Sequence, residues 1–133
     1  MKRLLVSVSL LLGAAAATAQ DLDYAGFLRS LRAEKTSIRH EGEVDQPFFA
    51  VKGKVIGLYG DHVQVFEYPD RAKAEKDAAQ VSADGMTIGT AKPHWLAPPH
   101  FFRRGKLIVV YVGNDEQVLR ALQERLGPAF AGG

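Results

Sequence analysis

Residues 99–127 read PHFFRRGKLIVVYVGNDEQVLRALQERLG and contain the signals that decide the fold. The continuous apolar run over 107–112 is typical of a strand that is covered on both faces. Arg104-Gly105 predicts a turn, so residues 100–103 and 106–112 are expected to pair as a β-hairpin. Asn114 is expected to cap the helix that follows, and Gly127 to end it. The inner face of that helix would carry Val118, Leu119, Leu122 and Leu126.

The preceding part of the chain predicts the same order of elements. Residues 48–68 are rich in Val, Ile and Phe and predict two strands around a turn at Gly60-Asp61. Gly53 and Gly57 lie inside the first of these strands, where glycine often marks a bulge or a close approach of another group. Asp70 is expected to cap a helix over 71–81. Further upstream we expect a helix over 21–36, capped by Asp21, and then a polar connector over 37–47.

A shift of 45 residues aligns the two strand–strand–helix units. It places Gly60 on Gly105, Val65 on Val110 and Asp70 on Asp115. The halves 48–85 and 93–127 are therefore candidates for a duplicated unit, although two copies are few and any two such units share turn and cap residues. With or without duplication, the prediction is an α+β two-layer sandwich. It would have an antiparallel sheet of about four strands with helices on one face.

The first 19 residues have the pattern of a secretory signal peptide. Lys2 and Arg3 precede an apolar run over 4–12, and small residues lead to Ala17-Thr18-Ala19. Cleavage after Ala19 would leave one domain, residues 20–133, in the periplasm or outside the cell. The alternative is an uncleaved membrane anchor. No apolar run long enough to span a membrane follows the signal.

Charge and cysteine content argue against two classes of protein, nucleic-acid-binding proteins and lipoproteins. The chain has 17 Lys and Arg against 15 Asp and Glu, and removal of Lys2 and Arg3 would make the two counts equal. A neutral exported chain is not expected to bind nucleic acid, which requires an excess of basic side chains. With no cysteine, the domain has no disulfide to support it and cannot be a lipoprotein of the usual kind.

Four stretches resemble a family of small exported bacterial proteins, many of them described only as hypothetical proteins or lipoproteins. They are GKVIGLYGDHVQVFEYPD (53–70), VSADGMTIGT (81–90), PHFFRRGKLIVVYVG (99–113) and LGPAFAG (126–132). The resemblance covers about residues 48–132 and implies export and a compact fold. The chain departs from the lipoprotein members because it lacks a cysteine at the signal boundary. No activity is known for that family, so no functional residue follows from the resemblance.

Patterns that would indicate catalysis or metal binding are weak. The four histidines form no HxH or HxxxH pair, and Glu41, Glu43 and Asp45 lack the glycine and glutamate of a calcium loop. We interpret this acidic segment as a solvated connector. The three serines after the signal lie outside any GxSxG motif. We therefore predict no catalytic residue, no metal site and no cofactor.

The most unusual segment is 92–104, which contains the only tryptophan and three of the six prolines. Aromatic side chains beside arginine are typical of binding surfaces. The competing interpretation is that Trp95, Phe101 and Phe102 close the edge of the core while the basic hairpin tip is solvated. As a binding hypothesis we expect Trp95 to be partly exposed near Arg103 or Arg104. The predicted ligand-binding residues are Trp95, His100, Phe102, Arg103 and Arg104.

The sequence thus favours a small exported non-catalytic binding module. Its partner would be an unknown protein or a small anionic or apolar ligand. A small extracytoplasmic enzyme or a metal-binding protein with an unrecognised site is the alternative. A homodimer formed through the sheet is a third interpretation.

Overall fold

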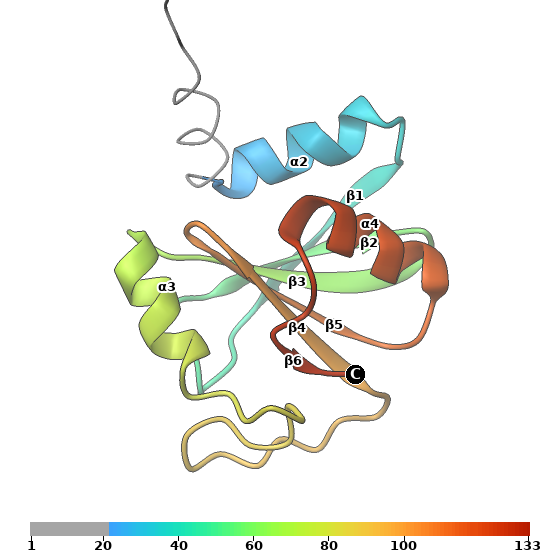
Figure 1. Ribbon diagram of the computed structural model, residues 1–133. Coiled ribbons are helices and arrows are strands. Elements are labelled where there is room, and N and C mark those ends of the chain that lie inside the picture. The colour runs from blue at the N-terminus through green and yellow to red at the C-terminus, as the bar shows by residue number, and fades with distance from the viewer. Residues whose placement is uncertain (1–21) are drawn as a thin grey trace, which may run out of the picture.

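The chain has an α+β fold, and the computed structural model describes residues 22–133 (Figure 1). The predicted signal peptide lies outside these described residues. The described helices are α2 (Tyr24–Ala33), α3 (Arg71–Ala78) and α4 (Glu116–Leu126). The strands are β1 (Ile38–Val44), β2 (Gly53–Leu58), β3 (Asp61–Glu67), β4 (Pro99–Arg104), β5 (Leu107–Val112) and β6 (Ala131–Gly132).

All six strands belong to one antiparallel sheet in the order β1-β2-β3-β5-β4-β6. The two predicted hairpins, β2–β3 and β4–β5, are both present, and they join where β3 pairs with β5. The first five residues of β5 are buried, as expected for its unbroken apolar run. Edge strands β1 and β6 add to the four predicted strands.

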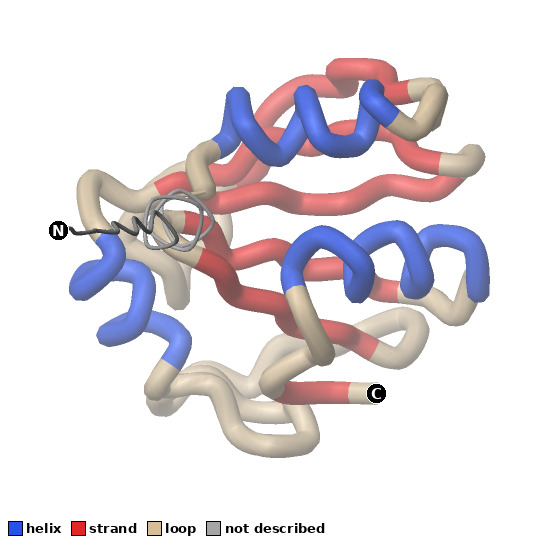
Figure 2. The backbone as a smooth tube through the Cα atoms, turned by 45° about the horizontal axis from the view of Figure 1, so that its top comes forward, coloured by secondary structure: helices blue, strands red, loops and turns tan. Residues whose placement is uncertain are grey.

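The helices cover both faces of the sheet, which corrects the prediction that they lie on one. Alternate residues of β5 point to opposite faces. Val109 belongs to the apolar cluster that includes side chains of α2 and α4, whereas Val110 belongs to the cluster with Ala74 of α3. Figure 2 shows α2 and α4 running along the strands on one side. A central strand that is apolar throughout needs cover on both sides, and α3 with its adjoining loops supplies the second layer.

Strand β1 was predicted to be part of a polar connector, and that prediction is wrong. Its residues alternate weakly, and Arg39, His40 and Glu43 are exposed. An edge strand can expose polar side chains on both faces, and charges there discourage pairing with other chains. The apolar alternation by which strands are detected is therefore missing. The predicted strand from residue 48 in fact begins at Gly53, because residues 45–52 form turns.

Carboxylates one or two residues from the predicted positions cap two of the helices. Asp23, rather than Asp21, caps α2, and its side chain accepts a hydrogen bond from Gly26 N at 2.8 Å. Asp115, rather than Asn114, caps α4 and accepts from Gln117 N at 2.8 Å. Asp70 caps α3 as predicted. A charged carboxylate at this place also interacts favourably with the positive end of the helix dipole.

The strand–strand–helix order occurs twice, but the structure does not confirm a duplication. Val65 and Val110, which the shift of 45 residues aligns, lie in different apolar clusters on opposite faces of the sheet. The helices that follow them also cover opposite faces. A two-fold axis perpendicular to the sheet would keep equivalent residues on one face, so the observed packing does not have that symmetry.

Candidate functional site

The five predicted ligand-binding residues do not share one surface. Four lie on β4, whose successive side chains point to opposite faces. Phe102 is 2% exposed and packs in the core beside α2 and α4. Arg104 points to the same face, and its Nη1 donates to the carbonyl oxygen of Arg125 in α4 at 2.5 Å. Arg103 points to the other face, where its Nη1 lies 3.7 Å from Glu75 of α3.

His100 is buried and has a structural environment. Its Nε2 lies 2.8 Å from the carbonyl oxygen of Gly113. Its ring stacks on Tyr111, with the ring centroids 6.0 Å apart. The Tyr111 hydroxyl in turn donates to Asp61 at 2.5 Å, and burial is the main cause that raises the pKa of Tyr111 to about 12. His100 therefore joins β4 to the residue that follows β5, and only 9% of it is exposed.

Trp95 is half-buried and held in a fixed orientation. Its Nε1 donates to the carbonyl oxygen of Gly85 at 2.9 Å. Phe48 and Phe101 pack against the indole in T-shaped geometry, with centroid separations of 6.2 and 6.0 Å. A buried indole N–H with a partner and edge-to-face aromatic neighbours gives a rigid apolar platform. The expectation that Trp95 is partly exposed agrees with this position, and so does the competing interpretation that Trp95 closes the edge of the core.

Two hollows share Trp95 as a wall. One has a volume of about 440 Å³ and is lined by Met86, Ala97, Pro98 and Pro99 together with Asp84 and the C-terminal glycines. The other has a volume of about 410 Å³, and its lining includes Pro47, Phe48, Pro93 and His94. Both volumes are within the range of small-ligand sites. We call this region the Trp95 surface and define it by Phe48, Met86, Trp95, Leu96 and Pro98.

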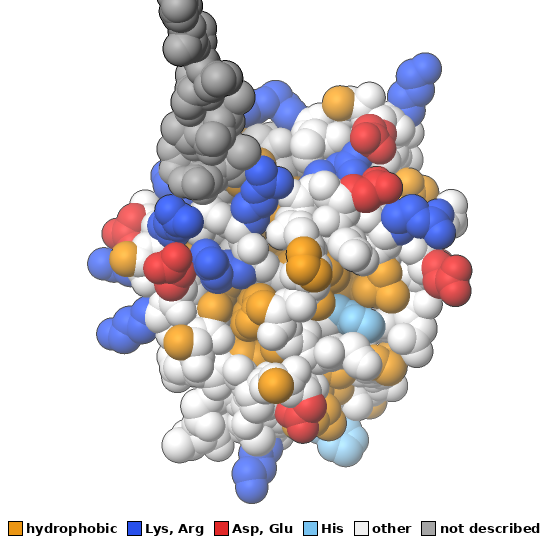
Figure 3. Space-filling model, viewed as in Figure 1, with side chains coloured by type: hydrophobic (Ala, Val, Ile, Leu, Met, Phe, Trp, Pro, Cys, Tyr) orange, Lys and Arg blue, Asp and Glu red, His pale blue; other side chains and the backbone are white. Residues whose placement is uncertain are grey.

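Large apolar side chains of the Trp95 surface are exposed to solvent. Leu96 is 92% exposed and Met86 is 48% exposed. In the view of Figure 3, most Lys and Arg side chains lie around α2 and α3, while the loop before β4 that carries Trp95 lies at the lower end of the molecule (Figure 1). An exposed apolar patch beside shaped hollows is a feature of interaction sites.

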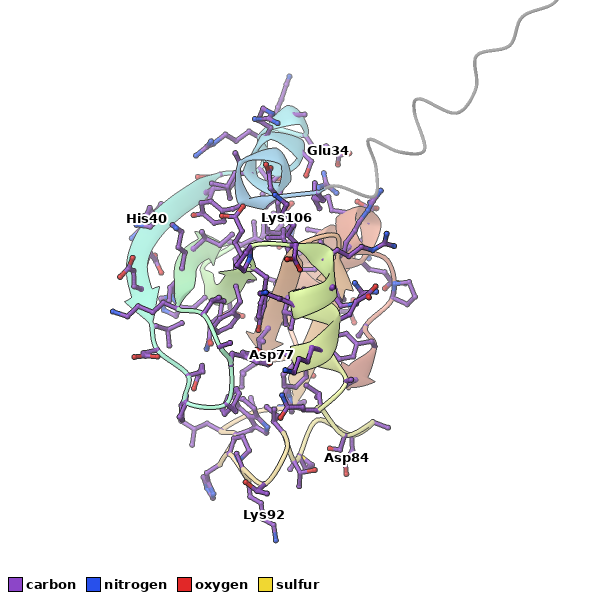
Figure 4. The ribbon with its side chains drawn as sticks, turned by 90° about the vertical axis from the view of Figure 1, so that its left-hand side faces the viewer. Glu34, His40, Asp77, Asp84, Lys92 and Lys106 are labelled. Carbon is purple, nitrogen blue, oxygen red and sulfur yellow. The ribbon has the colours of Figure 1, made fainter. Side chains whose placement is uncertain are left out.

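A buried carboxylate on α3 supports the Phe48 side of this surface. Asp77 is 7% exposed and accepts hydrogen bonds from the Ala50 backbone N–H at 2.8 Å and the Tyr68 hydroxyl at 2.7 Å. Figure 4 shows Asp77 between α3 and the loop that joins β1 to β2, and places Asp84 and Lys92 at the end of the molecule opposite α2. Burial, together with the hydrogen bond to Asp77, raises the pKa of Tyr68. Asp77 thereby fixes the loop that carries Phe48.

A second, polar cavity lies at the opposite end of β2. It has a volume of about 550 Å³, and Glu41 and His62 line it. His62 Nδ1 lies 2.5 Å from Glu41 Oε1, and Arg39 Nη2 lies 3.6 Å from Glu41 Oε2. Sequence reasoning missed this pair, because it treated Glu41 as part of a solvated connector and His62 as an ordinary strand-end residue. The two residues come from β1 and β3, which lie on either side of β2, and no local sequence pattern joins them.

Neither region resembles a metal centre. Among residues 22–133, no group of three or more His, Cys, Asp or Glu side chains is placed to hold a metal ion. Within the same part of the chain, none of the helices has the length and apolar character needed to cross a bilayer. Comparisons with protein-family models, curated proteins and solved structures found no match for this chain.

Proposed function

We propose that this chain is an exported, non-catalytic binding module. Its ligand would be an extended, proline-containing apolar peptide segment held on the Trp95 surface. The observation that carries the proposal is the nearly complete exposure of Leu96, at 92%, beside an indole that protein contacts hold in place. The signal-peptide pattern of residues 1–19 and the resemblance to small exported proteins support export.

The chemistry of the walls favours this class of ligand. The aromatic side chains of Trp95 and Phe48 line the hollows, and Pro93 and Pro98 stiffen the loop around them. Aromatic-lined grooves bind polyproline-type segments because such segments are already extended and lose little conformational entropy on binding. Two hollows that share one indole suit two successive apolar groups of such a ligand.

Tryptophan fluorescence provides the test, because Trp95 is the only tryptophan. The probe is a hexaproline peptide, with a glycine–serine hexapeptide as the negative control. We expect hexaproline to change the emission of Trp95 in a saturable way and the control peptide to leave it unchanged. An emission that hexaproline leaves unchanged up to millimolar concentration would refute the proposed ligand.

A matched pair of variants tests the location. Met86→Glu, Leu96→Glu adds two negative charges at the Trp95 surface. Lys73→Glu makes the same change in net charge on the exposed side of α3. We expect the first variant to bind hexaproline at least tenfold more weakly and the second to bind as the unsubstituted protein does. Equal affinities in both variants, with both folded by circular dichroism, would place binding elsewhere.

A further inference from the structure

The cavity lined by Glu41 and His62 is built by a specific irregularity of the sheet. The pairing of β1 with β2 shifts between His40 and Gly42, which leaves Glu41 as the extra residue of a β-bulge. Gly42 has a φ of 121°, a conformation that L side chains rarely adopt. Bulges of this kind redirect a side chain, and they occur often beside functional sites.

The side chain redirected by the bulge lies across a bare position on β2. A Cβ at Gly57 would fall 2.6 Å from Glu41 Oε2, so the carboxylate could not keep this position beside any other residue. From this position Glu41 contacts His62 through Oε1 and Arg39 through Oε2. Both carboxylate oxygens of the cavity's only acidic side chain are therefore engaged by groups of the chain itself.

The remaining polar side chains of the lining can all donate hydrogen bonds. The lining also contains Lys35, Thr36, Ser37 and Tyr59. Within residues 22–133, the ammonium group of Lys35 has no ion-pair partner. Lys35 and Arg39 supply two positive charges to the lining, and Glu41 supplies one negative charge. His62 and Arg39 already contact the Glu41 carboxylate. The cavity is thus matched to a ligand that brings acceptor oxygens and negative charge.

Unusual backbone conformations also occur at the cavity lined by Glu41 and His62. Lys35 and Tyr59 have φ values of 62° and 53°, and they are the only non-glycine residues with positive φ in the described part of the chain. Both line this cavity. Residues other than glycine adopt this conformation at a cost and tend to do so at functional sites. Here the conformation turns the chain at the end of α2 and between β2 and β3, and so forms two sides of the cavity.

We propose that this cavity binds the phosphomonoester group of a second ligand. A phosphomonoester carries up to two negative charges and several acceptor oxygens, which a lysine, an arginine and hydroxyl groups can contact from different directions. The volume of about 550 Å³ also leaves space for a small organic group attached to the phosphate.

Calorimetric titration at fixed pH and ionic strength measures this binding directly. The probe is glycerol 1-phosphate, and glycerol is its uncharged control. Vesicles that contain phosphatidic acid in phosphatidylcholine distinguish a lipid headgroup from a soluble ester, and pure phosphatidylcholine is their control. Binding of glycerol 1-phosphate indicates a soluble ligand, and binding of the phosphatidic acid vesicles alone indicates a lipid. If neither probe binds, the proposal is wrong.

Charge variants with opposite expected effects separate a binding site from general attraction to a basic surface. Lys35→Ala, Arg39→Ala should weaken binding of the probe at least tenfold. Lys73→Ala, Lys76→Ala removes the same charge from α3 and should change affinity less than twofold. Glu41→Gln keeps an acceptor for His62 but removes the negative charge, so it should strengthen binding at least threefold. Equal loss in the two double variants, or weaker binding by Glu41→Gln, would overturn the proposal.

Discussion

Replacement of Asp77 by alanine should destabilise the fold through two hydrogen bonds that link three segments of the chain. Asp77 on α3 accepts from the Ala50 backbone at 2.8 Å and from the Tyr68 hydroxyl at 2.7 Å, and the residue is 7% exposed. A hydrogen bond to a charged group contributes about 1.5–3 kcal/mol. Because both donors would lose their acceptor, we expect Asp77→Ala to lower the free energy of unfolding by about 3–5 kcal/mol.

The loss is large for a domain of this size. Total stabilities of about 5–15 kcal/mol are usual, so the variant should lie close to the limit of folding. A melting temperature lower by roughly 12–20 °C is expected, at about 4 °C per kcal/mol for a domain of about 110 residues. Urea unfolding followed by circular dichroism measures the free energy, and a thermal scan measures the temperature.

Tyr68→Phe is the matched control for this variant. It removes one donor but leaves the carboxylate with Ala50, so it should cost about 1.5–3 kcal/mol. If Asp77→Ala unfolds within about 1 kcal/mol of the unsubstituted protein, the carboxylate does not hold the loop, and the reasoning is refuted. In its folded state, the Asp77→Ala variant should also show a red-shifted Trp95 emission. Phe48 packs against the indole, and it lies on the loop that Ala50 anchors.

Two further predictions concern alkaline pH and processing. Folding raises the pKa of Tyr111 to about 12, and burial also raises that of Tyr68. The raised pKa values add to the free energy of unfolding. This contribution is fully present below the ordinary tyrosine pKa of about 10, and it is lost as the pH rises from there through the pKa values of the folded state. Urea unfolding between pH 9 and 12 should show that loss, and a stability that does not fall over this range would contradict it. The exported protein should begin at Gln20, as intact-mass measurement would detect; a full-length mass in the membrane fraction would indicate an uncleaved anchor.

The parts of the fold that could be predicted are those whose signals are local. The β4–β5 hairpin has its turn glycine between two apolar segments, and α3 begins directly after Asp70, which was predicted as its cap. Strand β1 could not be predicted, because an edge strand needs no apolar alternation and its partner β2 supplies the pairing. The short strand β6 depends on β4 in the same way.

The predicted site agrees only in part with the structure, because residues that are neighbours in the sequence were expected to lie on one surface. Residues 100–104 form a strand, so period-two alternation separates Phe102 from Arg103 and sends them to different faces. Trp95 belongs to a loop and meets Phe48, which comes from the connection before β2. No spacing in the sequence predicts this contact or the Glu41–His62 pair, because each depends on the order of the strands in the sheet.

One feature of the sequence, a pair of glycines in β2, nevertheless marks both the Trp95 surface and the polar cavity. Gly53 and Gly57 weaken β2 as a strand, and glycine at such positions often indicates a close approach by another group. Both lie on the face of β2 opposite Ile56. A Cβ at Gly53 would fall 2.6 Å from the ring of Phe66, and one at Gly57 would fall 2.6 Å from the Glu41 carboxylate.

The two close approaches support different sites. The ring of Phe66 packs against Phe49 with centroids 4.8 Å apart, and Phe49 packs against Phe48 with centroids 4.9 Å apart, so the Gly53 end of β2 supports the Trp95 surface. The Gly57 end carries the carboxylate of the polar cavity. Side chains from neighbouring segments therefore fill the places that β2 leaves empty, and this explains why a strand inside the sheet contains two glycines.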